Sequence, residues 1–261
     1  MTTTTPTPGR YVPAGSFTSP TRPSLTRLSR MEIRKMTDTR AGVSLLALTA
    51  AATLAIGVLQ VLNPAGGLKD DVSSLMLPAS VMLPVLGILA VTSEWSQHTA
   101  LSTFTLVPQR HRVAIAKLAA AIAVALASVL TVLVLSVIVT LLAAALDRGP
   151  ATWNLSAPAL TEMTLIQIGE VVLGAAFGLV LMNTPAAIVL HFVLPSSIGL
   201  LSNVPAITPV IPWLDWGTAT LDLSDGTLHG YAWAKVATAS VVWIGIPLAL
   251  GLFRLARRDV R

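Results

Sequence analysis

Two ionisable side chains, Glu170 and His191, lie inside long apolar stretches of the sequence. A charge within a membrane-spanning segment is costly, so such a residue is a functional candidate by default. Glu170, Gly174 and Gly178 recur at i, i+4 and i+8, which places them along one face of a helix, and Gly174-x-x-x-Gly178 is a close-packing motif. Glu170 is therefore expected to face another helix or a cavity. There it would either make a structural hydrogen bond or line a substrate path.

His191 suggests a proton relay with Glu170. Counted from the hairpin turn, from Met182 for Glu170 and from Thr184 for His191, at the helical rise per residue, Glu170 lies about 18 Å deep and His191 about 10 Å deep. This offset of more than one helical turn predicts that the two side chains do not pair directly. His191 is accordingly interpreted as a core residue.

Several catalytic and nucleotide-binding motifs are missing from the sequence. None of the four lysines follows a glycine, as the lysine of a phosphate-binding P-loop does, and neither His-Glu-x-x-His nor Gly-x-Ser-x-Gly occurs. There is no cysteine, which excludes thiolate metal sites and a cysteine nucleophile. We expect no catalytic residue, no metal ligand and no cofactor on this chain. Any ATP and Mg²⁺ would be bound by another polypeptide.

The elements that carry these residues are expected to be membrane helices. Of the 261 residues, 54% are hydrophobic and 11% charged, with mean hydropathy +0.75, whereas a soluble domain carries roughly 25% charged residues. Six apolar stretches are predicted to span a bilayer: residues 41–62, 74–91, 113–146, 163–182, 185–201 and 234–253. The third would reach about 50 Å as one helix, so it must tilt or project from the membrane. The fourth and fifth should form a tight hairpin.

The remaining residues indicate a tail and an orientation. Residues 1–30 are rich in Thr, Ser and Pro and are predicted to be a disordered tail, followed by one membrane domain over 31–261. Six spans place fourteen of the seventeen Lys and Arg residues on one side, which predicts that both termini are cytoplasmic. The basic balance then reflects anionic lipid and not nucleic acid. Asp70 and Asp71 are interpreted as solvated loop charges.

The polar segment 93–110 connects the second and third stretches. Trp95, Leu101 and Phe104 recur at loosely helical spacing, and Pro108 would end such a helix. Two interpretations fit this pattern: a helix lying at the membrane interface, or a helix that docks on a cytoplasmic partner.

At this point the sequence resembles a known family. The run from Glu94 to Lys117, the segment 31–40 before the first span, and the hairpin 174–187 are similar to the permease subunits of ABC-2-type exporters. The residues of the first run that carry the resemblance are Glu94, Thr99, Pro108, Arg110, Arg112 and Lys117. The resemblance covers about residues 28–261.

The resemblance implies an all-α polytopic protein of the bacterial inner membrane with six spans. It implies that segment 94–107 is a coupling helix held in a groove of an ATP-binding subunit, and that the complex contains two permease copies. The expected docking residues are Glu94, Trp95, Thr99, Leu101, Phe104 and Pro108. The residues expected to anchor the chain at the cytoplasmic surface are Glu32, Arg34, Lys35, Arg40, Arg110, Arg112 and Lys117.

The segment 202–233 precedes the last span. The resemblance implies that it forms short helices that dip back into the outer face. Alternatively, Trp213, Trp216, Tyr231 and Trp233 form only an interfacial aromatic belt. Two other functions stay open: a proton-coupled secondary transporter that uses Glu170, and a non-transporting immunity or scaffold protein of the membrane.

Overall fold

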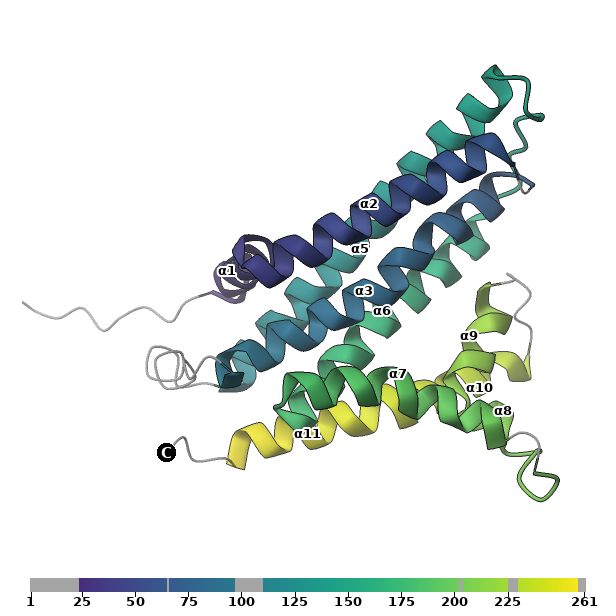
Figure 1. The fold of residues 1–261 in the computed structure, drawn as a ribbon. Helices are drawn as coiled ribbons and strands as arrows, with labels where there is room; N and C mark the ends of the chain where they lie inside the picture. The colour runs from purple at the N-terminus through teal and green to yellow at the C-terminus, as the bar shows by residue number, and fades with distance from the viewer. Residues whose placement is uncertain (1–23, 65, 97–109, 202–203, 225–229, 258–261) are drawn as a thin grey trace, which may run out of the picture.

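The computed structural model describes residues 24–64, 66–96, 110–201, 204–224 and 230–257, and every regular element in these ranges is helical, as predicted (Figure 1). The elements are α1 (Leu25–Asp38), α2 (Arg40–Leu62), α3 (Leu68–Ser96), α5 (Arg110–Ala145), α6 (Ala157–Leu181), α7 (Thr184–Leu200), α8 (Ile211–Leu214), α9 (Trp216–Ser224), α10 (Tyr231–Ser240), the π-helical turn η2 (Val241–Gly245) and α11 (Ile246–Arg257).

Five helices are long and apolar enough to cross a membrane, as a multi-pass membrane protein requires. They are α2, α3, α5, α6 and the continuous run from α10 through α11. Helix α5 is a single uninterrupted helix, as predicted for the long third stretch. The predicted fifth span forms α7, which has only 17 residues. A tight turn at Met182 and Asn183 joins α6 to α7 and confirms the predicted hairpin.

Two helices begin earlier than the sequence predicted. Helix α1 starts at Leu25, inside the predicted tail, because the Ser24 side chain accepts a hydrogen bond from the Arg27 backbone N–H and caps the helix. Residues 1–23 lie outside the described part of the chain. Helix α3 starts at Leu68, where two aspartates in the first turn favour the positive end of the helix dipole. It also continues to Ser96, inside the predicted loop.

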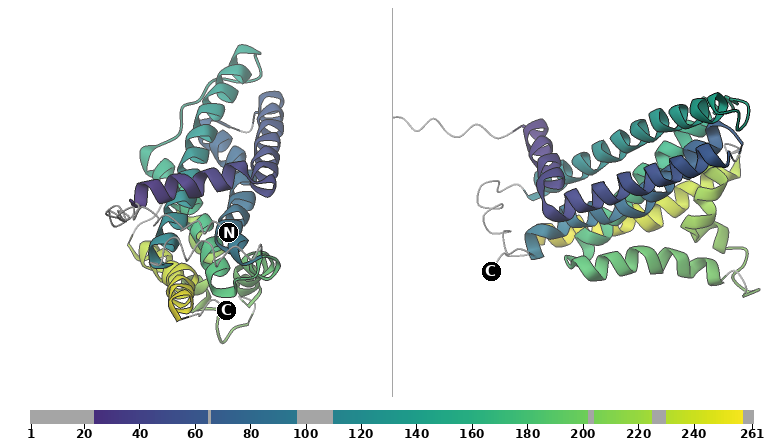
Figure 2. Two further views of the ribbon diagram at one scale, coloured as in Figure 1. Left: turned by 90° about the vertical axis from the view of Figure 1, so that its left-hand side faces the viewer. Right: turned by 45° about the horizontal axis from the view of Figure 1, so that its top comes forward.

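Helices α3 and α6 form the centre of the bundle, since they are the most buried of the five long helices. Figures 1 and 2 show α2 and α5 together on one side of this pair and α7 with α11 on the other. Helix α1 lies across one end of the bundle, where α3 and α11 end and α5 begins. We call this the basic end. Helices α8 and α9 lie at the opposite end, which we call the far end.

The two central helices touch backbone to backbone. A Cβ atom added to Gly174 of α6 would lie 2.5 Å from the carbonyl oxygen of Pro84 on α3, whereas one added to Gly178 would lie 3.3 Å from that of Ile88. The Gly-x-x-x-Gly motif therefore packs closely, as predicted, and its partner is α3.

These two glycines give a stability test. Gly174→Ala forces the rigid helix backbones apart and should lower the free energy of unfolding by about 1–3 kcal/mol. Gly178→Ala, the matched control, needs a shift of only a few tenths of an ångström and should change it by less than about 1 kcal/mol. Thermal unfolding of the purified chain in detergent measures both. Equal effects of the two variants would contradict the packing described.

Candidate functional site

A buried ion pair joins three helices at the basic end. Lys117 of α5 is only 4% exposed, and its Nζ lies 2.9 Å from Oε2 of Glu32 on α1. The same ammonium donates a hydrogen bond of 2.7 Å to the carbonyl oxygen of Ala90 on α3. A charge removed from water needs such compensation, because the cost of burying it unpaired is several kcal/mol. Lys117 thus ties α1, α3 and α5 together.

The position of α1 follows from the same contacts. The second carboxylate oxygen of Glu32 accepts a hydrogen bond of 2.6 Å from Lys35, and Met36, one turn after Glu32, is buried in the core between α3 and α5. The chain then turns into α2 at Thr39, whose hydroxyl accepts the Gly42 N–H at 3.2 Å. The amphipathic segment expected before the first span is therefore a helix fixed by charge and by apolar packing.

Three of the predicted anchoring residues, Glu32, Lys35 and Lys117, come together in this ion-pair cluster. Arg34 and Arg40 are instead exposed, and Arg112 is half-buried on α5. The remaining residue of that group, Arg110, is the first of α5.

The predicted docking residues are only partly described. Glu94 and Trp95 belong to the last turn of α3 rather than to a separate loop helix, because α3 extends to Ser96. The other four, Thr99, Leu101, Phe104 and Pro108, lie outside the described residues. The ends of α3 and α5, between which segment 97–109 runs, are joined through the bond from Lys117 to Ala90.

A second polar cluster surrounds Glu170 in the middle of α6. Its Oε1 accepts a hydrogen bond of 2.6 Å from Nε1 of Trp216, the first residue of α9. Its Oε2 lies 3.8 Å from Nε2 of His191 on α7. The prediction that Glu170 and His191 do not meet is therefore wrong. It compared helix depths at Cα and left out the reach of two long side chains.

Trp216 corrects another prediction. The belt alternative placed it at the membrane interface, yet it is 6% exposed and lies among α6, α7 and the last span. Tyr231 and Trp233 at the far end are exposed, as the belt interpretation requires.

The Glu170 cluster lines an open cleft of about 240 Å³, into which Asp215 and His191 also face. His191 is buried as predicted, and its Nδ1 has no hydrogen-bond partner among the described residues. Asp215 caps α9, since its carboxylate accepts hydrogen bonds from the Gly217 N–H and the Thr218 hydroxyl. At 3.8 Å an imidazole and a carboxylate can exchange a proton through one bridging water, or hold a small polar solute between them. No group of three or more His, Asp or Glu in the described ranges is placed to hold a metal ion.

One buried acid was misjudged from the sequence. Asp71 is not a solvated loop charge: it lies in the first turn of α3, is 6% exposed, and accepts a hydrogen bond of 2.6 Å from the Thr140 hydroxyl on α5. The signal in the sequence was Thr140, the last polar residue of α5 before its apolar end. The bond links α3 and α5 at the far end, as Lys117 does at the basic end.

The chain matches no protein-family model and no curated protein sequence.

The Glu32–Lys117 pair makes a testable prediction. Glu32→Leu alone should lower the free energy of unfolding by about 3–5 kcal/mol, because it leaves the buried Lys117 ammonium without its carboxylate. Lys117→Met alone should lower it by less, because Glu32 keeps its bond to Lys35. The double variant should lose far less than the sum, since two apolar side chains replace a neutralised pair. Chemical unfolding of the chain in detergent, monitored by tryptophan fluorescence, measures the cycle.

Lys35→Met is the matched control for this cycle. Its side chain is 47% exposed, so solvent screens its contact with Glu32 and the expected loss is about 1 kcal/mol or less. Additive losses in the double variant would show that the two buried charges do not stabilise each other.

Proposed function

We propose that this chain is the permease subunit of an ATP-driven exporter of the ABC-2 type, in the bacterial inner membrane with both termini cytoplasmic. A separate ATP-binding subunit would bind ATP and Mg²⁺ and move segment 94–107 of the permease. The permease would then switch access from the cytoplasmic or inner-leaflet side to the outside. Such a switch is a coupling between two distant sites.

The observation that carries this proposal is the Lys117 junction. It ties α1, α3 and α5 where segment 97–109 leaves and re-enters the bundle. A force applied to that segment by a docked subunit would reach both helices at once instead of bending one. Close packing of α3 on α6 at Gly174 would carry the displacement to Glu170 and its cleft.

Helix α7 and the segment of α8 and α9 support the six-span arrangement of such a permease. Helix α7, at about 1.5 Å per residue, nearly spans the hydrocarbon core and would be the fifth crossing. Trp216 reaches Glu170 halfway along α6, and the indole N–H of Trp243 donates a hydrogen bond of 2.6 Å to the carbonyl oxygen of Leu214. Both bonds favour a segment of α8 and α9 that dips back into the membrane.

The proposed partners follow from the same scheme. A second permease copy, identical or paralogous, would form the transport path with this one, and two ATP-binding subunits would drive the pair. The exposed basic residues of α1 would face anionic membrane lipid, with no role in binding nucleic acid.

Co-purification tests the proposal. The tagged chain, extracted from its native membrane in mild detergent, should bring a soluble P-loop ATPase in a fixed ratio. Glu94→Ala with Trp95→Ala should lower ATPase recovery, or leave recovery intact while uncoupling ATP turnover from transport. Trp153→Ala, an exposed tryptophan at the far end, is the matched control and should change neither. Recovery of the chain without any ATPase would overturn the proposal.

The contact of Glu170 with His191 favours a second candidate, a proton-coupled secondary transporter. In that case Glu170→Gln should abolish transport driven by a pH gradient in proteoliposomes, because an amide cannot take up a proton. Glu162→Gln is the matched control: Glu162 is a buried glutamate of α6 that lies outside the cleft, and its variant should transport normally. Full activity of Glu170→Gln would remove this candidate.

A further inference from the structure

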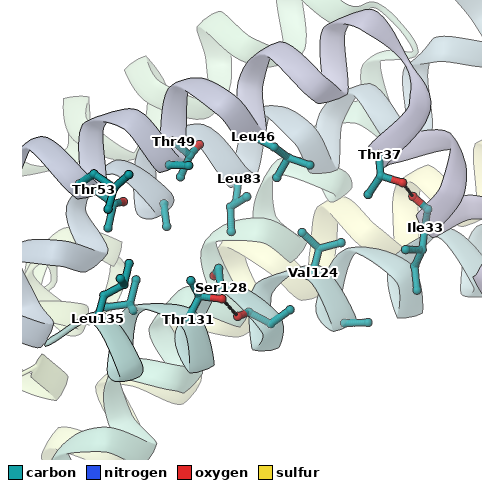
Figure 3. A pocket seen from close by; sticks show the side chains of 16 residues that line it. Ile33, Thr37, Leu46, Thr49, Thr53, Leu83, Val124, Ser128, Thr131 and Leu135 are labelled. Atoms are coloured by element: carbon teal, nitrogen blue, oxygen red, sulfur yellow. Dashed lines mark hydrogen bonds between the residues drawn. The ribbon is translucent and has the colours of Figure 1, made fainter. Parts of the chain in front are cut away.

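A groove of about 550 Å³ runs along the side of the bundle between α2 and α5, with α3 as its floor and α1 across one end. Figure 3 shows Ile33 and Thr37 of α1 at one end and Thr53 and Leu135 at the other. We call this the lateral groove. It does not include Glu170 or Lys117.

The lateral groove is suited to hydrocarbon and not to a polar solute. Most of its lining is Leu, Ile, Val and Ala. Five hydroxyl-bearing side chains also line it, of which Thr53 is 4% exposed. The other four, Thr37, Thr49, Ser128 and Thr131, donate to a backbone carbonyl of their own helix, and Figure 3 shows the bond from Thr37 to Ile33. Four of the five hydroxyl protons are therefore already bonded, so a polar ligand would gain little here to offset its desolvation.

The shape of the groove fits an extended chain. A second depression of about 270 Å³ continues from it towards the far end and shares Thr53, Leu54 and Leu135 with it. The two together follow α2 along the direction in which it would cross a membrane. Lipid tails are as apolar as leucine, so an apolar groove within a bilayer gains little from being covered by another protein and is readily filled by an acyl chain.

The basic end of the groove carries unneutralised positive charge. Arg30 lies three residues before Ile33, and Arg34 three residues before Thr37, so each arginine is a helical neighbour of a groove-lining residue. Both arginines are exposed, and within the described part of the chain no ion pair is formed by either. Glu32 is neutralised by Lys117 and Lys35, which leaves Asp38 as the exposed acid of α1.

We infer that the lateral groove binds one acyl chain of an anionic phospholipid, whose headgroup phosphate is held by Arg30 and Arg34. The lipid comes from the leaflet at the basic end. A guanidinium binds phosphate oxygens in a planar, bidentate arrangement, and α1 presents two of them one helical turn apart. The inference stands independently of the exporter proposal, because it uses neither segment 97–109 nor a partner subunit.

Lipid immobilisation tests whether the lateral groove binds an acyl chain. The full chain is reconstituted in nanodiscs with phosphatidylglycerol or phosphatidylcholine spin-labelled on the acyl chain, and the motionally restricted fraction is measured. Ala50→Phe fills the groove and should remove the specific restricted fraction of phosphatidylglycerol. Ala51→Phe is the matched control, since Ala51 is the next residue of α2, is also exposed and does not line the groove. Equal fractions in the two variants would overturn the inference.

Separate variants test whether Arg30 and Arg34 hold the lipid headgroup. Arg30→Ala with Arg34→Ala should reduce the preference for phosphatidylglycerol over phosphatidylcholine by roughly fivefold for each arginine removed. Both side chains are exposed, so this test does not depend on how Ala50→Phe folds. Arg148→Ala, an exposed arginine at the far end, is the control and should keep the preference. A wild-type chain without any preference between the two lipids would overturn the assignment of the arginines.

A second copy of the chain is the competing occupant of the groove. Native mass spectrometry of the same samples distinguishes the two. Retained phosphatidylglycerol, lost in Ala50→Phe but not in Ala51→Phe, supports the lipid. A dimer that Ala50→Phe converts to monomer without any loss of lipid overturns the inference and makes the groove an interface between copies.

Discussion

The ammonium of Lys117 is buried and must be compensated within the protein, and that constraint fixes one end of the molecule. It lies in α5 among helices that would meet hydrocarbon on their outer faces, where an unpaired charge is not tolerated. The compensating carboxylate comes from α1, a helix outside the spans, and a second hydrogen bond goes to the carbonyl of Ala90. Helix α1 therefore cannot leave the bundle without removing the carboxylate from Lys117. A segment that looks peripheral in sequence is part of the core.

Close contacts between α3 and α6 connect the Lys117 junction to the Glu170 cleft. Ala90 lies three residues beyond Gly87 on α3, and a Cβ at Gly87 would lie 2.7 Å from the carbonyl oxygen of Val171 on α6. Gly174 meets α3 in the same way, and Glu170 lies one turn before it. Packed backbones without intervening flexible side chains do not absorb small shifts. A displacement of α3 at the basic end must therefore move α6, which carries the cleft.

The sequence was sufficient for the long helices, because hydrophobic length reports the solvent that each helix meets. The motif at Gly174 also indicated close packing, since its spacing is a local property. Pairing between helices could not be predicted in this way. Lys117 meets Glu32, 85 residues away, and Glu170 lies near His191. Both contacts depend on how the helices are rotated and tilted and on how far the side chains reach, and no local sequence pattern encodes these. Trp216 was misassigned for the same reason, because an indole suits an interface and a buried hydrogen bond equally well.

The Lys117 junction and the Glu170 cluster differ in the free energy needed to disrupt them. Separating a buried ion pair costs about 3–5 kcal/mol, whereas a single neutral hydrogen bond contributes about 1 kcal/mol, and somewhat more when one partner is charged. The cleft is held by single bonds such as that from Trp216 to Glu170, and the 3.8 Å separation from His191 is longer than a hydrogen bond. Rearrangement therefore costs less at the cleft than at the Lys117 junction. The proposed exporter, driven from the basic end, would need this order, because the junction would have to stay intact while it passes a displacement to a site that can open.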